Sequence, residues 1–174
     1  MCDLNLKLKA KNIKLVAFDV DGVMTDGSLI YSSSGEELKT FNAKDGQGIV
    51  MLNKAGIKTA IITAKDSPIV LKRAEILGIT KVFTGQRNKS KALNSLIEEF
   101  KLDKSEVAYM GDDYPDLCVI KEVGLSCCPN DAIEDIKNSV SFVSNCGGGK
   151  GAVREFCDFI LKAKNITFKD LMKG

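Results

Sequence analysis

Two aspartates, Asp19 and Asp21, directly follow a run of apolar and β-branched residues at 13–18 that predicts a buried strand. Gly22 comes next, so the backbone can turn there and both carboxylates leave the sheet together. Carboxylate and carbonyl oxygens at this spacing suit a hard cation such as Mg²⁺. With its charge screened by a cation, Asp19 can attack an anionic phosphate, while Asp21 is placed to give and take a proton. A polar turn that only caps the strand is the alternative interpretation.

Polar residues also follow the other predicted strands. Ligands of a doubly wound parallel sheet bind outside the carboxyl ends of its strands, so the residues there are candidates for a site. Each has a structural alternative, such as a helix cap, a solvated lysine or a negative first helical turn. Together they supply a phosphate-binding hydroxyl, an ammonium group and further metal ligands beside the first two carboxylates. These residues are Thr63, Lys89, Asp112, Asp113 and Asp116.

The elements that must position these residues alternate along the chain. Short apolar runs predict strands, and the amphipathic segments between them predict helices. This alternation predicts an α/β fold of the doubly wound, Rossmann-like type with a mainly parallel sheet. The predicted strands are Ile13–Phe18, Lys58–Ile62, Lys81–Phe83, Val107–Met110 and Gly124–Ser126, and the predicted helices are Gly46–Ala55, Pro68–Leu77, Ser90–Phe100 and Asp113–Glu122.

The segment at about 27–41 breaks this alternation. Two short apolar stretches flank Ser32-Ser33-Ser34-Gly35, which predicts a β-hairpin inserted after the first strand. The chain contains neither a linker nor a repeat, so we expect a single domain over residues 1–174. A glycine-rich tail and a helix are expected at about 146–174.

The composition excludes several classes of function. The chain has no histidine, which removes Ser-His-Asp triads, phosphohistidine intermediates and the usual catalytic zinc sites. A net charge of +2 with scattered lysines gives no nucleic-acid-binding face. No apolar run is long enough to span a membrane, and residues 1–11 lack the apolar core of a signal peptide. The six cysteines form no C-x-x-C pair, and most lie in apolar contexts, which suits a reducing cytoplasm.

The order of the polar groups resembles the haloacid dehalogenase superfamily of aspartyl-phosphate phosphotransferases. Its four signatures occur as Asp19-x-Asp21-Gly22-Val23, Thr63, Lys89 and Gly111-Asp112-Asp113-x-x-Asp116. Further segments resemble the cap-less branch that contains the 3-deoxy-D-manno-octulosonate 8-phosphate phosphatases. They lie at 20–27, 35–39, 41–46, 85–89 and 148–155, so that the similarity spans nearly the whole chain.

This resemblance implies a Mg²⁺-dependent phosphatase for a sugar-acid phosphate, of the type used in lipopolysaccharide biosynthesis. In such an enzyme Asp19 is the nucleophile, and Asp21 is the general acid and base. The Asp19 carboxylate, the Asp21 carbonyl and Asp112 would hold the metal ion. Thr63 and Lys89 would bind the phosphoryl oxygens, where charge must be stabilised during transfer.

The resemblance also implies supporting residues, a substrate pocket and an assembly. Asp113 and Asp116 would hold waters and the site lysine. The hairpins of several subunits would pack together in a homotetramer and roof each site with a neighbour. The residues implied in substrate binding are Asn42, Ala43, Lys44, Asp45, Gly46, Lys65, Arg73 and Arg154.

Three positions depart from the pattern of these relatives and leave the substrate open. Relatives usually have Thr-Gly-Arg where this chain has Thr63-Ala64-Lys65, and often arginine where it has Val50. An arginine fork grips a carboxylate with two parallel hydrogen bonds, which a lysine cannot reproduce. The candidates are therefore 3-deoxy-D-manno-octulosonate 8-phosphate and a related 2-keto sugar acid phosphate such as a nonulosonate 9-phosphate. A phospho-accepting receiver module is a distant alternative, because receivers place the acceptor aspartate on their third strand.

Overall fold

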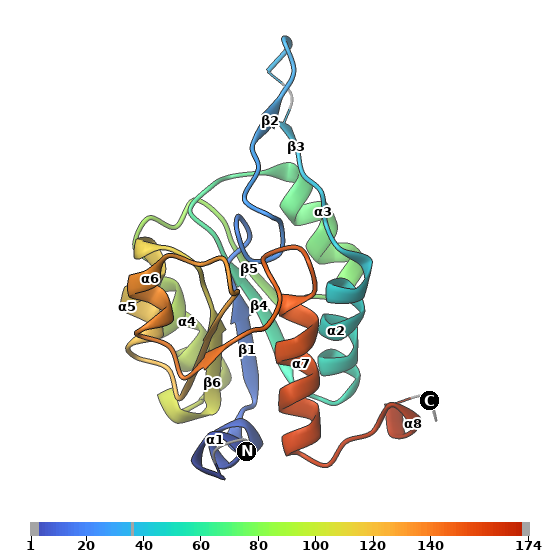
Figure 1. Cartoon of the computed structure of the whole chain (residues 1–174), viewed down its shortest axis with the longest axis vertical. Helices are drawn as coiled ribbons and strands as arrows, with labels where there is room; N and C mark the ends of the chain where they lie inside the picture. The colour runs from blue at the N-terminus through green and yellow to red at the C-terminus, as the bar shows by residue number, and fades with distance from the viewer. Residues whose placement is uncertain (1–3, 36, 172–174) are drawn as a thin grey trace.

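A six-stranded sheet with strand order β5-β4-β1-β6-β7-β8 forms the centre of the molecule, and all its neighbouring strands run parallel. The computed structural model describes residues 4–35 and 37–171. The chain moves outward from β1 to β4 and β5, then returns to the other side of β1 at β6, which creates a switch point beside β1. The strands are β1 (Leu15–Phe18), β4 (Lys58–Ile62), β5 (Lys81–Phe83), β6 (Val107–Met110), β7 (Leu125–Cys128) and β8 (Phe142–Val143) (Figure 1).

Helices cover both faces of this sheet. They are α1 (Leu4–Asn12), α2 (Ala43–Lys54), α3 (Pro68–Leu77), α4 (Lys89–Phe100), α5 (Leu117–Ile120), α6 (Glu134–Lys137), α7 (Ala152–Ala163) and α8 (Phe168–Leu171). Val16 and Phe18 of β1 pack in one apolar core with α1, α2, α3 and α7, whereas Leu15 and Ala17 pack in a second core with α4, α5 and α6. Successive side chains of a strand point to opposite faces, so a strand buried on both faces is apolar throughout. The predicted doubly wound α/β fold is confirmed.

The predicted bounds of β4, β5, β6 and α3 match the structure. Ser67 occupies the N-cap position of α3, Pro68 is its first residue, and Gly78 ends it in the left-handed conformation with φ 64°. The other predicted strands and helices before residue 112 are present with shifted ends. Helix α2 begins at Ala43 rather than Gly46, because the Asn42 side chain accepts the first amide groups of the helix. The sequence did not predict α1, α6 or β8.

The predicted helix Asp113–Glu122 is wrong as a single element. The structure has a 3₁₀ turn at Tyr114–Asp116 followed by the short helix α5. The Asp113 side chain accepts the Tyr114 amide, and the Asp116 side chain accepts two amide groups of the loop before it. These side-chain bonds replace the first backbone bonds that a regular helix would make.

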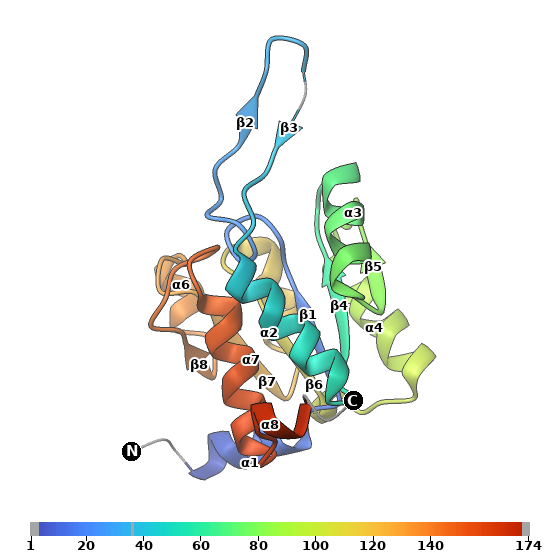
Figure 2. The same ribbon diagram turned by 90° about the vertical axis from the view of Figure 1, so that its right-hand side faces the viewer.

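The predicted hairpin projects from the carboxyl end of the sheet, beyond the ends of α2 and α3 (Figures 1 and 2). It pairs β2 (Ile30–Tyr31) with β3 (Glu37–Leu38) in antiparallel register. Apolar side chains on it are largely exposed: Leu29, Ile30, Tyr31 and Leu38 retain 48–59% of their accessible surface. Glu36, part of a motif behind the resemblance, lies outside the described residues, as do Cys2 and residues 172–174 of the expected tail.

Within the described ranges, no helix is both long and apolar enough to cross a membrane. The thiols of Cys127, Cys128 and Cys157 are buried and free, as expected for cysteines that act as small apolar residues. Cys118 is exposed, and Cys146 is partly buried.

Candidate active site

Asp19 is the first residue after β1 and opens a tight loop at the carboxyl end of the sheet. Its amide donates to the Met110 carbonyl of β6 at 2.9 Å, so the strand pairing extends to this residue. Three amide groups further along the loop all donate to the Val20 carbonyl, at 2.9–3.2 Å. Gly22 adopts a φ of 87°, and a side chain there would collide with the Asp112 carboxylate. The glycine therefore permits the acidic loop, residues 19–25, to lie against Asp112.

Lys89, the first residue of α4, brings its ammonium group to two carboxylates. Its Nζ lies 2.9 Å from Oδ2 of Asp19 and 2.6 Å from Oδ1 of Asp116, and only 1% of the residue is exposed. The Tyr109 phenol donates to the same Asp116 oxygen at 2.6 Å. The other Asp116 oxygen accepts two backbone amide groups from the loop after β6. Asp116 is thus saturated with donors and fixes Lys89 against Asp19.

The charges of this cluster are strongly coupled. Burial and the neighbouring Asp116 charge raise the pKa of Asp19 to about 7, against the opposing effect of Lys89. Burial and the Asp19 charge raise the pKa of Asp112 to about 8. Burial alone would lower the pKa of Lys89, but Asp19 and Asp116 outweigh it and raise that pKa above its ordinary value. The cluster therefore holds more negative charge than Lys89 neutralises.

The residues of this cluster fit a hard divalent cation. Oxygen atoms of Asp19, Asp112 and Asp116 lie within 4.8 Å of one another. Oδ1 of Asp112 is buried and receives no hydrogen bond from any residue in the described ranges. Such an oxygen is energetically costly unless a ligand binds it. Because the oxygens of Asp116 are occupied by other donors, Asp19 and Asp112 are the carboxylates left for a cation.

Asp21 is held by a different lysine from the hairpin. Lys39 follows β3, and its Nζ forms an ion pair with Oδ1 of Asp21. The Lys39 side chain is only 1% exposed, whereas that of Asp21 is 23% exposed. The two aspartates of the loop thus have separate ammonium partners on separate elements.

The glycine-rich tail packs directly against the acidic loop. The Gly149 amide donates to the Val23 carbonyl at 2.9 Å. A side chain at Gly148 would collide with the backbone of the loop, so the approach requires glycine. The tail therefore buttresses the loop that presents Asp19 and Asp21.

The predicted substrate segment at 42–46 connects this tail to α2 and α7. Asn42 donates to the Gly149 carbonyl at 3.1 Å, and Asp45 accepts two amide groups at the start of α7, at 2.8 and 3.3 Å. Gly46 is buried against an arginine of α3, whereas Ala43 and Lys44 are exposed. The buried members of the segment have structural contacts, and their predicted contact with substrate stays a prediction.

The two predicted substrate arginines lie on α3 and α7. The Arg73 guanidinium lies 5.5 Å from the centre of the Phe41 ring, and its buried Nε has no hydrogen-bond partner in the described part of the chain. Arg154 donates from Nε to both carboxylate oxygens of Asp158 at 3.0 Å. Arg154 and Lys44 line a cavity of about 520 Å³ beside α7 whose lining does not include the acidic cluster.

Thr63, Lys65 and Val50 have different surroundings. Thr63 directly follows β4 and is 2% exposed, so its hydroxyl lies at the carboxyl end of the sheet. The Lys65 Nζ is buried, and no described residue forms a hydrogen bond with it. A buried ammonium group without a partner is unfavourable, which indicates an anionic ligand. Val50 lies on α2 and packs against the apolar core.

Two residues of this site were missed from the sequence. Tyr109 lies inside a strand whose other residues are apolar, so its hydroxyl gave no signal. Lys39 lies within a segment that supports the family resemblance, but neither its residue type nor its spacing indicated a partner. Only the folded hairpin brings Lys39 to Asp21.

The chain is similar in sequence and in fold to known proteins. Residues 77–155 match the haloacid dehalogenase-like hydrolase family. The chain is 43% identical over 156 residues to the 3-deoxy-D-manno-octulosonate 8-phosphate phosphatase of Escherichia coli K12, covering 90% of this chain and 83% of that protein. A crystal structure of the phosphatase from Yersinia pestis superimposes with a TM-score of 0.93 at 40% identity, covering 98% of this chain and 90% of that one.

A third relative was crystallised with ligands. The structure of the phosphatase from Moraxella catarrhalis in complex with a magnesium ion, a phosphate ion and 3-deoxy-D-manno-octulosonate is 42% identical to this chain. It superimposes with a TM-score of 0.91 and covers 94% of each chain. Since this identity extends over nearly the full length of both partners, the chain belongs to the 3-deoxy-D-manno-octulosonate 8-phosphate phosphatase family of haloacid dehalogenase-like hydrolases and is a phosphoric monoester hydrolase.

Proposed function

We propose that this enzyme hydrolyses 3-deoxy-D-manno-octulosonate 8-phosphate to the free sugar acid and phosphate, with Mg²⁺ as its cofactor. The observation that carries the proposal is the buried cluster in which Lys89 holds Asp19 next to the unpartnered Asp112 oxygen. The names and bound ligands of the relatives support the same substrate.

The chain's residues divide the phosphoryl transfer into two steps. A carboxylate oxygen of Asp19 attacks phosphorus, and the bond to the sugar oxygen breaks as Asp21 gives that oxygen a proton. Asp21 then takes a proton from water as the water oxygen attacks the aspartyl phosphate. The second step releases inorganic phosphate and restores the Asp19 carboxylate.

Lys89 and Thr63 would bind the phosphoryl oxygens throughout both steps. Lys89 is fixed by Asp116 and Tyr109, so its charge is oriented before substrate arrives. Asp19, Asp112 and the Asp21 carbonyl would hold Mg²⁺, which when bound supplies positive charge that screens the carboxylates from the anionic phosphate. Asp113 is exposed and would contact the waters of this ion.

The buried Lys65 ammonium supports a role in binding the sugar carboxylate. It gives a point charge where an arginine would give a bidentate contact. For that reason a related 2-keto sugar acid phosphate, such as a nonulosonate 9-phosphate, remains the second candidate substrate. Asn42 to Gly46, Arg73 and Arg154 complete the proposed substrate-binding set.

The proposal is tested by phosphate release from a panel of sugar phosphates, with Mg²⁺ present and then chelated. We expect the octulosonate phosphate to give the highest kcat/KM and chelation to abolish turnover. Release that continues unchanged after chelation would contradict the mechanism. A nonulosonate phosphate that is turned over far better would replace the substrate and leave the phosphatase chemistry intact.

The proposal includes a single domain over residues 1–174. The enzyme would act in the cytoplasm, in lipopolysaccharide biosynthesis, and would assemble as a homotetramer. The exposed apolar side chains of the hairpin support assembly, because a projecting two-stranded hairpin is marginally stable alone. Packing hairpins together would bury these side chains and shield each site from water. Sedimentation velocity should show a tetramer, and a fully active monomer at nanomolar concentration would contradict this assembly.

A further inference from the structure

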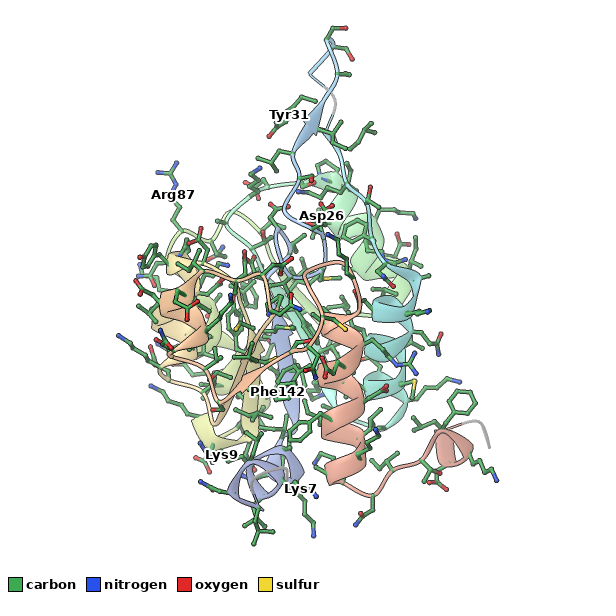
Figure 3. All side chains as sticks on the ribbon, in the orientation of Figure 1. Lys7, Lys9, Asp26, Tyr31, Arg87 and Phe142 are labelled. Carbon is green, nitrogen blue, oxygen red and sulfur yellow. The ribbon has the colours of Figure 1, made fainter. Side chains whose placement is uncertain are left out.

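The general acid and base of the proposed reaction, Asp21, forms an ion pair with a lysine from a distant part of the fold. Lys39 reaches it from the end of the hairpin, and the Lys39 side chain is buried to 1% exposure. Asp26, which directly follows the acidic loop, lies at the base of this hairpin, and Tyr31 lies further out along it (Figure 3). The hairpin, an insertion outside the sheet, thus contributes a buried positive charge to the acidic loop.

The contact is specific to one oxygen of the carboxylate. Lys39 donates to Oδ1 of Asp21, while Oδ2 receives no hydrogen bond from the residues in the described ranges. A carboxylate that rotates freely presents its oxygens at random, whereas one held at Oδ1 keeps Oδ2 directed to a fixed position. Proton transfer requires a heavy-atom distance of about 2.6–3.2 Å, so this orientation controls its rate.

We propose that Lys39 is a positioning residue that orients Asp21 for both proton transfers. Lys39 fixes Oδ1, and Oδ2 gives the proton to the sugar oxygen and later takes one from water. This inference rests on the proposed acid and base role of Asp21. It also means that the hairpin contributes to the chemistry of its own subunit, in addition to any role in assembly.

Asp19 and Asp21 are oriented by different lysines, so the two contacts can be tested separately. The nucleophile Asp19 is oriented by Lys89, which Asp116 and Tyr109 hold in turn. Removing Lys39 leaves those contacts in place. We therefore expect the loss to affect proton transfer rather than nucleophilic attack.

The experiment compares Lys39→Met and Lys39→Arg on an alkyl phosphate, the octulosonate phosphate, and an aryl phosphate, p-nitrophenyl phosphate. Methionine keeps the apolar stem without the charge, whereas arginine keeps a charged donor. For Lys39→Met we expect kcat on the alkyl phosphate to fall by about 10–100-fold, within the range of acid–base catalysis, with KM changed less than about threefold. Lys39→Arg should recover much of this loss.

The aryl substrate separates the two steps of the reaction. Nitrophenolate leaves without a proton, so phosphorylation of Asp19 should continue in Lys39→Met while hydrolysis of the aspartyl phosphate slows. A pre-steady-state burst of nitrophenolate, approaching one per active site, is the expected signature. Lys91→Met, which removes an exposed lysine of α4, is the matched control and should show neither the burst nor the loss.

A double-mutant cycle with Asp21→Asn makes the test independent of folding. If Lys39 acts through Asp21, adding Lys39→Met to Asp21→Asn should change the aryl phosphatase rate by less than about twofold. An additional loss in that background, the absence of a burst with the aryl phosphate in Lys39→Met, or a raised KM with unchanged kcat would overturn the inference. If Asp21→Asn itself keeps full alkyl phosphatase activity, the proposed role of Asp21 fails instead.

Discussion

Lys89 and Lys39 each hold one aspartate of the acidic loop, but their surroundings differ. Lys89 belongs to α4, a helix that packs on the central sheet. It is buried in a hydrogen-bonded network with Asp116 and Tyr109. Lys39 comes from a projecting hairpin and meets Asp21, whose side chain is 23% exposed. Asp19, the proposed nucleophile, is therefore fixed by the core of the fold, and Asp21, the proposed proton-transfer group, by an insertion.

This difference suits the role that the proposed mechanism gives to each aspartate. Asp19 forms and breaks one bond at a single place, so a rigid, buried setting orients it well. In that mechanism Asp21 would exchange protons with a leaving group and then with water, which requires access to solvent. The two settings predict different responses to substitution.

The largest expected effect is that of Asp19→Asn. A neutral amide is a poor nucleophile and a weaker metal ligand, so we expect phosphate release to fall below detection on alkyl and aryl substrates alike. Asp21→Asn should retain part of its aryl phosphatase activity while losing most activity on the alkyl substrate. Asp135→Asn, at an exposed position on α6, serves as the control for both. Equal losses for Asp21→Asn on both substrates would contradict the distinction between the two aspartates.

The second effect concerns stability. Lys89→Met leaves Asp19 and Asp116 buried without their cation, and we expect the free energy of unfolding to fall by about 3–5 kcal/mol. Lys39→Met leaves a carboxylate that water can reach, so a smaller loss of about 1–2 kcal/mol is expected. Urea unfolding of the two variants measures this difference. Similar losses in the free energy of unfolding would show that the Lys39–Asp21 contact stabilises the fold as much as the Lys89 network does.

Metal binding should depend on pH because Asp19 and Asp112 of the acidic cluster must lose their protons to bind a cation. The pKa values of Asp19 and Asp112 are raised to about 7 and about 8, from 3.8. In the metal-free protein the protonated Asp19 and Asp112 contribute their whole share of the free energy of unfolding below about pH 4. This contribution is lost as the pH rises through 7 and 8. We expect Mg²⁺ to bind the ionised groups, and at about 100 times its Kd a ligand stabilises the folded state by about 2.7 kcal/mol.

We therefore expect Mg²⁺ to raise Tm more at about pH 8.5 than at about pH 5.5, as measured by calorimetry. Asp112→Asn should remove most of this dependence, because it removes the ionisable carboxylate whose Oδ1 receives no hydrogen bond from the described residues. A Mg²⁺ effect that is equal at both pH values would contradict the assignment of the metal to this cluster.

Lys65 extends the comparison to a third lysine and gives the smallest expected effect. Its buried Nζ has no hydrogen-bond partner in the described ranges, so its partner is expected to be the substrate. Lys65→Arg should lower KM for the octulosonate phosphate by up to about tenfold and change kcat little, since a bidentate contact is worth about 1–3 kcal/mol. A higher KM, together with better turnover of another sugar phosphate, would show a pocket shaped for that ligand.

Much of this site could be predicted because its residues occur where strands end. The apolar run before Asp19 predicted the strand, and parallel strands bring Thr63 and Asp112 to the same edge. The prediction of a helix at 113–122 was wrong because the Asp113 and Asp116 side chains accept nearby backbone amide groups. These bonds compete with helical backbone bonds, and residue propensities do not reveal that competition.

By itself the sequence determined the parallel sheet, the hairpin, the two aspartates and the family, since all of these depend on local patterns and motif order. Only the tertiary structure decided the contacts between segments distant along the chain. The Lys39–Asp21 pair and the Tyr109–Asp116 bond are two such contacts. Hydrogen bonds and ion pairs depend on distances of a few ångströms, and packing of the whole chain sets those distances. The division of labour between the two lysines therefore became visible only in the fold.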